Sequence, residues 1–164
     1  MKRALSLCAV WIAFGIVISH ANAASDRLND LQLVIPKVAP SGQITVRMVN
    51  ASRKNSLRVW TEANSWGALK WKIVIVRGAQ TLVVFEDPDG VGFTKNTPQF
   101  ETISPEGHVE RQLDVNGEYW SKRQGGIHFD PGDRITVIYD VPPEKEAKEM
   151  HVWYGVAAST MVVK

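Results

Sequence analysis

The chain has 164 residues, with 19 lysines and arginines, 17 aspartates and glutamates, and one cysteine. A formal net charge of +2 gives little support to a nucleic-acid partner, because such proteins carry a clear excess of positive charge. A single cysteine cannot form a disulfide within the chain, so a buried core must supply the stability. The length suffices for one domain.

The N-terminus has the pattern of a secretory signal peptide. Lys2 and Arg3 precede an apolar run over residues 4–18, and residues 21–23 are the small residues that a signal peptidase recognises. A membrane anchor is the alternative, but the run is short for a span and no basic stop-transfer cluster follows it. We therefore predict a signal peptide over residues 1–23.

Cleavage would leave residues 24–164 as a single domain, periplasmic or secreted, without stable membrane insertion. It would remove Cys8 and two basic residues, so that 17 basic and 17 acidic residues remain. Because the net charge is then near zero, binding driven by charge to nucleic acid or to an anionic membrane loses its support.

Strand patterns begin soon after the predicted cleavage point. Residues 31–35 alternate apolar and polar side chains, and Pro36 is expected to end this first strand. Gln43–Asn50 alternates more clearly, and residues 57–61 are expected to return beside it as a hairpin, joined by a polar turn.

The strongest pattern covers residues 69–85, where two β-branched and aromatic runs are joined by a short loop that carries Gly78. Trp71, Ile73 and Ile75 share one face of the first run, because side chains alternate along a strand. This segment predicts a β-hairpin inside a sheet.

The second half continues the pattern. Residues 108–115, 134–141 and 151–159 are predicted strands, and the first two follow turns that contain Pro and Gly. Residues 143–150 give the only helix signal, with proline at the start and good helix formers after it. The chain therefore predicts an all-β fold, an antiparallel immunoglobulin-like β-sandwich of about eight strands with one short helix near 143–150.

Three local motifs support a resemblance to known proteins. They are the Asn-Ala-Ser turn at residues 50–52, the Pro-Gly turn at residues 131–132 and the Val-Trp-Tyr-Gly segment at residues 152–155. In these motifs and in strand order the chain resembles bacterial exported immunoglobulin-like domains. It is weakly similar to the bacterial intracellular proteinase inhibitors, and this resemblance implies a sandwich fold. Ile135 stands where that family has a tyrosine, so no inhibitory residue is carried over.

No catalytic motif appears. The predicted domain has three histidines, on different predicted segments, and no activated thiol or serine motif: His108, His128 and His151. A shared zinc or copper site is the alternative, but the spacing of these histidines does not mark one. We predict a protein that is not an enzyme and has no metal or other cofactor.

Two functions from different classes fit these observations. We predict a binding module that recognises a protein partner, with inhibition as one form of that role. The alternative is a carbohydrate- or envelope-binding module that stacks a glycan on exposed tryptophans. The candidate binding residues lie in two polar loops, 64–67 and 117–126, and are Trp66, Tyr119, Trp120, Lys122 and Arg123.

The two functions differ in what they require of the tryptophans. Trp60, Trp71 and Trp153 lie in predicted strands and are expected in the core. For Trp66 we favour a lid over the end of the sandwich, because so large an apolar ring is seldom left exposed. For Trp120 the glycine and basic neighbours favour an exposed recognition residue, and a core lid is the alternative.

Overall fold

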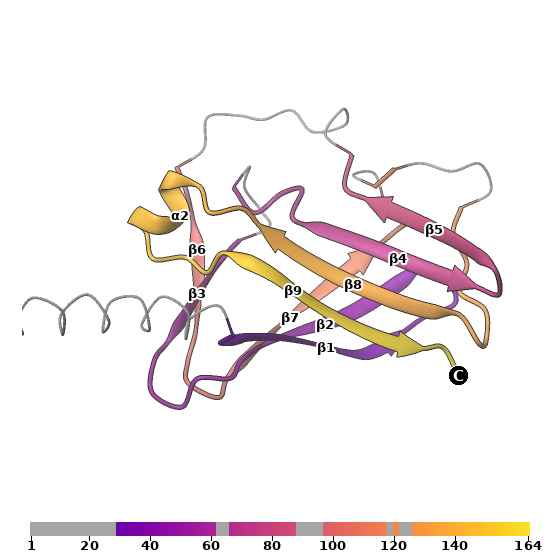
Figure 1. Cartoon of the computed structure of the whole chain (residues 1–164), viewed down its shortest axis with the longest axis horizontal. Helices are drawn as coiled ribbons and strands as arrows, with labels where there is room; N and C mark the ends of the chain where they lie inside the picture. Colours follow the sequence, from indigo (N-terminus) through magenta and orange to yellow (C-terminus); the bar gives the residue numbers. More distant parts are fainter. Residues whose placement is uncertain (1–28, 62–65, 88–96, 118–119, 122–125) are drawn as a thin grey trace, which may run out of the picture.

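A computed structural model of the protein describes residues 29–61, 66–87, 97–117, 120–121 and 126–164 (Figure 1). The predicted signal peptide, residues 1–23, lies outside the described residues. Within those residues, no helix combines the length and the apolar character needed to cross a membrane.

The described chain forms nine strands and one short helix, and all strand pairs are antiparallel. In chain order these are β1 (Leu31–Val38), β2 (Gln43–Asn50), β3 (Leu57–Trp60), β4 (Trp71–Arg77), β5 (Gln80–Phe85), β6 (Phe100–Ile103), β7 (His108–Asp114), β8 (Arg134–Val141), α2 (Lys145–Glu149) and β9 (Gly155–Val162). The predicted all-β class is confirmed.

The strands form two layers that face each other across the core, as in a sandwich (Figure 1). One layer is the sheet β5-β4-β8-β9, and the other contains the sheet β1-β2-β7, with β3 and β6 paired as a separate ribbon. β1 and β9 lie against each other, where one edge of each layer meets the other. The core fills the space between the layers.

The predicted central hairpin is confirmed. β4 and β5 pair from Arg77 and Gln80 at the turn to Lys72 and Phe85 at the open end, and β8 flanks β4 on the other side. Gly78 adopts a positive φ of 56°, which a tight two-residue turn requires. Since β4 has neighbours on both edges, it is one of the two inner strands of its sheet.

The predicted hairpin between Gln43–Asn50 and residues 57–61 is wrong. β2 pairs with β1 and β7, whereas β3 pairs with β6, a strand that the sequence pattern did not reveal. The reason lies at Asn50, whose side chain is fully buried and whose amide donates to the carbonyl oxygens of Asn55, Ile103 and Ser104 at 2.8–3.1 Å. These bonds hold the chain in a bend that carries it away from β2.

Two strand ends also differ from the prediction. β1 continues through Pro36 to Val38, because the pairing with β2 shifts register between Val34 and Lys37 and such an irregularity needs no amide from proline. β9 begins at Gly155 rather than at residue 151. The amides of Val152 and Trp153 donate instead to Ala147 and Arg58, so they are not free for a ladder.

Aromatic rings fill the end of the core nearest α2. The Trp71 and Tyr139 centroids are 4.6 Å apart, and Tyr139 stacks on Trp153 at 5.9 Å. Trp60, Trp71 and Trp153 are at most 4% exposed, so the prediction that these three rings lie in the core is confirmed. Tilted and offset ring pairs of this kind add to the stabilisation from buried area.

Replacing Ile73 by alanine tests the central place of β4. Ile73 is fully buried, so Ile73→Ala should lower the free energy of unfolding by about 2–5 kcal/mol, through lost apolar contact and a residual cavity. Chemical denaturation measures this change. Val83→Ala on the neighbouring strand is the control, because Val83 is 50% exposed and its truncation should cost much less. An equal loss in both variants would contradict the assigned burial.

Candidate functional site

Arg77, at the end of β4, joins three parts of the chain. Its guanidinium makes a two-pronged bond to the Asp133 carboxylate, with Nε to Oδ1 at 2.9 Å and Nη2 to Oδ2 at 2.7 Å. Nη2 also donates to the carbonyl of His128 at 2.8 Å, and Nη1 lies 2.8 Å from a carboxylate oxygen of Asp130. The hairpin tip is thereby fixed to the turn before β8.

Asp133 is the buried member of this cluster, with a side chain only 2% exposed. Its hydrogen bond from Arg77 lowers the pKa of the Asp133 carboxyl below its usual value, against the opposing effect of burial. The backbone amide of Asp130 also donates to this carboxylate, at 2.9 Å. The carboxylate is therefore held ionised. The groups that donate to it, the Arg77 guanidinium and the Asp130 amide, fix the hairpin tip and the turn in place.

Asn116 positions the segment that runs past the hairpin tip. Its amide donates to the carbonyls of Ser41 and Ile127, both at 2.9 Å, and its side-chain oxygen accepts from the Ile127 amide at 2.6 Å. Gly42 lies so close that a Cβ there would overlap the Asn116 amide, and its φ is +94°. Asn116 and Arg77 together hold residues 126–128 beside β5.

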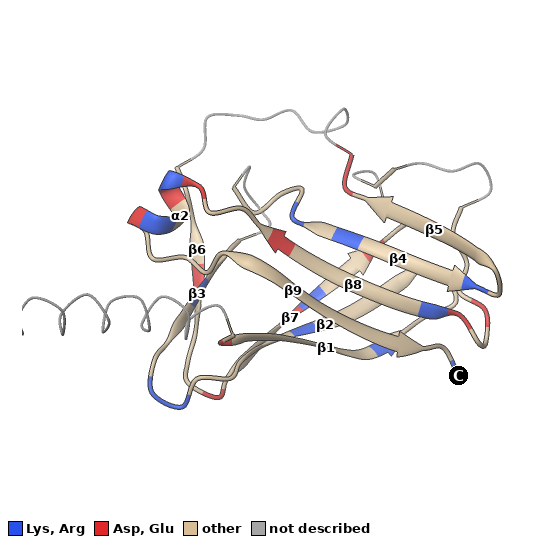
Figure 2. Ribbon diagram, in the orientation of Figure 1, with Lys and Arg blue, Asp and Glu red and all other residues tan. Residues whose placement is uncertain are grey.

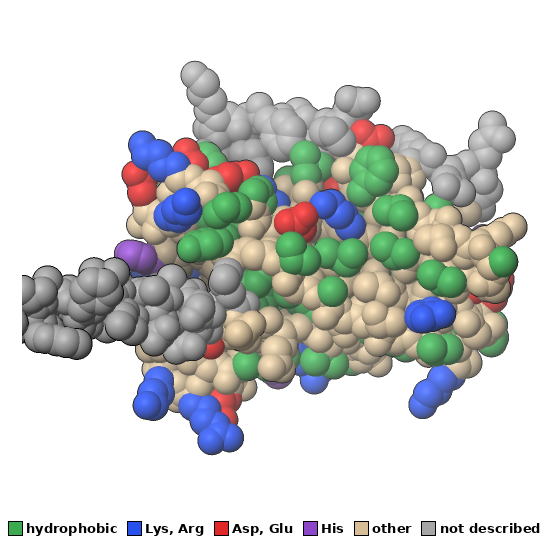
Figure 3. Space-filling model, in the orientation of Figure 1, with side chains coloured by type: hydrophobic (Ala, Val, Ile, Leu, Met, Phe, Trp, Pro, Cys, Tyr) green, Lys and Arg blue, Asp and Glu red, His purple; other side chains and the backbone are tan. Residues whose placement is uncertain are grey.

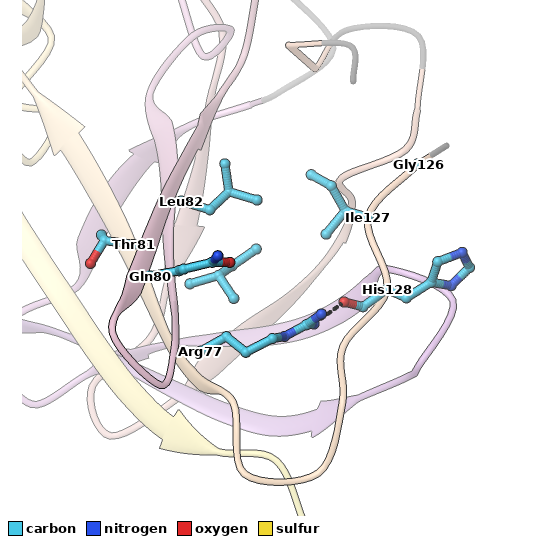
Figure 4. A pocket seen from close by; sticks show the side chains of 8 residues that line it. Arg77, Gln80, Thr81, Leu82, Gly126, Ile127 and His128 are labelled. Carbon is cyan, nitrogen blue, oxygen red and sulfur yellow. Dashed lines mark hydrogen bonds between the residues drawn. The ribbon is translucent and has the colours of Figure 1, made fainter. Parts of the chain in front are cut away.

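A pocket of about 520 Å³ lies between the hairpin tip and this segment (Figure 4). Ile75, Leu82 and Ile127 supply apolar walls, and the Gln80 amide lies beside them. In the close-up the Thr81 side chain points away from the cavity and the His128 ring is turned outward. Polar and apolar atoms line the pocket about equally, and its guanidinium is already paired with carboxylates.

Among the described residues, contacts cover the outer edge of β5 at one end only. Glu86 forms an antiparallel bridge with Trp120, and the Ser121 amide donates to the Phe85 carbonyl at 2.9 Å. The pocket lies toward the other end of the strand, near Gln80 and Thr81. In the described part of the chain, the edge of β5 is therefore paired near Phe85 and unpaired near Thr81.

Trp120 does not have the exposure that was predicted for a recognition residue. Its side chain is 6% exposed and belongs to the hydrophobic core, so the core-lid alternative is correct for this ring. The bridge to Glu86 explains the difference, because it draws Trp120 onto the edge of β5. Tyr119, Lys122 and Arg123, the other candidates in this loop, lie outside the described residues.

Trp66 is partly buried, as the favoured lid prediction requires. It packs against the core, with its ring centroid 6.0 Å from that of Trp60. The two loops that were predicted to hold the binding residues therefore contribute tryptophan rings that cover the core. Neither ring stands out as a flat platform.

The outer face of the four-stranded sheet carries several exposed apolar side chains among polar ones (Figure 3). Registers place the outward side chains in three rows across the strands: Phe85, Lys72, Ile138 and Ala158; Val83, Val74, Thr136 and Thr160; and Thr81, Val76, Arg134 and Val162. Val83, Phe85, Val156 and Val162 are 46–67% exposed. We name this surface the outer face of β5-β4-β8-β9.

Histidine placement bears on the metal alternative. His108, His128 and His151 are all exposed, on β7, in the segment beside the pocket and just after α2. Within the described ranges, no three side chains of metal-binding type come together.

The residues that build the pocket were not among the sequence candidates. Arg77 and Asp133 lie more than fifty positions apart and meet only through the pairing of β4 with β8. A local signal did exist for Asp133, which closes a Pro-Gly turn, and for Asn116, which follows a strand. Neither pattern indicates the distant partner.

The Arg77–Asp133 pair predicts a pH-dependent contribution to stability. Because the pKa of Asp133 is lower in the folded than in the unfolded chain, the pair stabilises above the ordinary aspartate pKa of about 3.9, and this contribution is lost as pH falls through the folded pKa. Asp133→Asn should lower the unfolding midpoint at neutral pH, and its difference from wild type should shrink in acid.

Thermal unfolding from neutral to acid pH measures this difference. Asp130→Asn is the matched control, because Asp130 meets the same guanidinium but has a side chain 58% exposed. Its effect on the midpoint should be smaller. A difference for Asp133→Asn that stays constant at all pH values would contradict the pairing.

Trp120→Ala tests the corrected position of that ring. A buried tryptophan typically costs about 3–5 kcal/mol when truncated to alanine, so the variant should unfold much more easily than wild type. Phe85→Ala, where the ring is 46% exposed, should cost less and serves as the control. An unchanged midpoint for Trp120→Ala would restore the recognition hypothesis for this residue.

Comparison of the chain with protein-family models, with curated proteins and with solved structures finds no match. The resemblance to the proteinase inhibitors thus stays a prediction from sequence motifs.

Proposed function

We propose that the protein is an exported binding module, without catalytic activity, that recognises a protein partner. The observation that carries the proposal is the apolar outer face of β5-β4-β8-β9. In an antiparallel sandwich the outward positions are ordinarily polar, because only the inward side chains are buried. Here they include Val74, Val76, Val83 and Phe85 on two adjacent strands.

The exposed apolar side chains of this face are the feature that favours a protein interface. Apolar side chains that form a contiguous exposed surface commonly mark contact sites, whereas single exposed ones carry no such meaning. Val74 and Ile138 are half-buried, and Val83 and Val156 are more exposed, so all four strands contribute apolar side chains to this face. Lys72 and Thr136 lie among them.

The polar groups on this face are largely satisfied within it. Lys72 and Asp140 form an ion pair at 2.7 Å, and the hydroxyls of Thr136 and Thr160 are 2.8 Å apart. Groups that already have partners lose less on desolvation than unpaired ones. A protein partner could therefore cover the face without leaving these groups unpaired.

The tryptophans favour a protein partner over a glycan. The carbohydrate alternative required exposed rings, but Trp60, Trp71, Trp120 and Trp153 are buried and Trp66 packs on Trp60. The inhibitory role implied by the family resemblance is one form of protein binding. The support described here comes from a sheet face rather than from a loop.

A pair of matched valine variants tests the proposal. Val83→Ser places a hydroxyl on the outer face, and Val34→Ser makes the same change on β1, where Val34 is 44% exposed against 50% for Val83. Each tagged protein is cross-linked in a cell-envelope extract of the native host, and captured proteins are quantified by mass spectrometry. We expect a partner retained by wild type and Val34→Ser and strongly reduced with Val83→Ser.

Equal capture by all three proteins would show that the outer face is not the binding surface. Capture of nothing above a bead control would contradict protein binding altogether. Circular dichroism of both variants confirms that a loss of capture is not a loss of fold, because neither valine belongs to the core.

A further inference from the structure

We infer that the partner is bound through an extended segment that pairs with the open edge of β5 and inserts an apolar side chain into the pocket beside Leu82. This inference rests on the proposed function, because it names how the protein partner is held. Addition of a strand to a sheet edge is a common mode of peptide recognition. Three features of the described chain support it here.

The first feature is the direction of the β5 backbone groups. The Phe85 carbonyl accepts from Ser121, so Phe85 faces away from β4, and period-two alternation turns Val83 and Thr81 the same way. Among the described residues, no hydrogen bond from outside the β4–β5 ladder reaches Thr81 or Val83. Their amides and carbonyls are available to a further strand.

The second feature is the absence of the usual protection for a sheet edge. Natural edges are commonly blocked by lysine, proline or inward-pointing charge. β5 reads Gln-Thr-Leu-Val-Val-Phe, with neither charge nor proline, and Figure 2 shows no charged residue along it. The chain itself pairs with this edge at Ser121, which shows that its geometry suits an added strand.

The third feature is the pocket. Gln80 and Leu82 face the interior of the sandwich, opposite to Thr81 and Val83, and they line the cavity together with Ile75 and Ile127 (Figure 4). A strand paired with β5 would place its own inward side chain next to Leu82. That side chain would enter the pocket, so backbone pairing and side-chain selection occur at one place.

Charge decides which side chain the pocket selects. Arg77 is the cation that lines it, and Asp133 and Asp130 already neutralise that guanidinium. An acidic side chain would therefore find no unpaired arginine or lysine among the residues that line the pocket. The walls favour a branched apolar side chain, such as leucine, with the Gln80 amide at the rim.

A synthetic strand serves as the probe. It is a short fluorescent peptide of alternating threonine and valine, with leucine at its centre and lysine at each end, and the control peptide carries aspartate in place of leucine. Fluorescence anisotropy with the full-length mature protein should show saturable binding of the leucine peptide and at least tenfold weaker binding of the aspartate peptide. Amide hydrogen exchange at Thr81 and Val83 should slow when the leucine peptide binds.

Proline substitution distinguishes binding at the edge of β5 from binding at the outer face of β5-β4-β8-β9. Thr81→Pro removes an outward amide without removing a β4–β5 ladder bond, a change that an edge strand tolerates. It should weaken peptide binding at least tenfold, whereas Thr81→Ser, which keeps the amide, should bind as wild type does. If Thr81→Pro reduces folding, Val83→Pro provides the same test at the next outward residue of β5.

The inference is overturned if the leucine peptide does not bind, if it binds without protecting Thr81 and Val83, or if both proline variants bind it as well as wild type does. Capture of a native partner that depends on Val83→Ser but is unchanged by Thr81→Pro would overturn strand pairing and leave protein binding in place. Peptide binding as expected, without any partner sensitive to Val83→Ser, would reject the outer face and keep the edge site.

Discussion

The bond between Arg77 and Asp133 is the constraint on which the arrangement around β5 depends. A guanidinium and a carboxylate meeting through two parallel hydrogen bonds fix both distance and orientation, more strongly than a single point contact. The pair holds the end of β4 against the turn that starts β8, and through the His128 carbonyl it also places one wall of the pocket. The hairpin tip, the turn and the wall are therefore held together by one side chain.

Local pattern was enough to find most strands but not to pair them. β4, β7 and β8 were predicted from alternation, because side chains on their inward faces are more buried than those on their outward faces. β5 was predicted from its β-branched and aromatic residues after the loop that carries Gly78. The pairing of β3 with β6 was missed. It depends on the buried side chain of Asn50, which satisfies three distant carbonyls, and nothing in its neighbours distinguishes it from an ordinary turn asparagine.

The candidate site was less predictable than the fold, for a related reason. Trp120 was predicted as a recognition residue because it lies in a loop beside glycines and basic residues, but its bridge to Glu86 places it in the core. The outer face is visible only after the registers align Val83 with Val74 and Thr136 across three strands. The side chains of this surface come from different strands and become neighbours only when the strands pair. A pattern along the sequence therefore cannot reveal the surface.

The contact between β1 and β9 has a consequence for the order in which the fold can be completed. Nearly the whole described chain lies between these two strands, so closing that edge requires a late segment to meet an early one. During synthesis or transport from the N-terminus, β1 and β2 emerge long before the strand that covers their flank. Until β9 arrives, the edge of β8 is open to pairing with other chains. A chaperone that shields the edge of β8 would thus be needed most in the interval before β9 emerges.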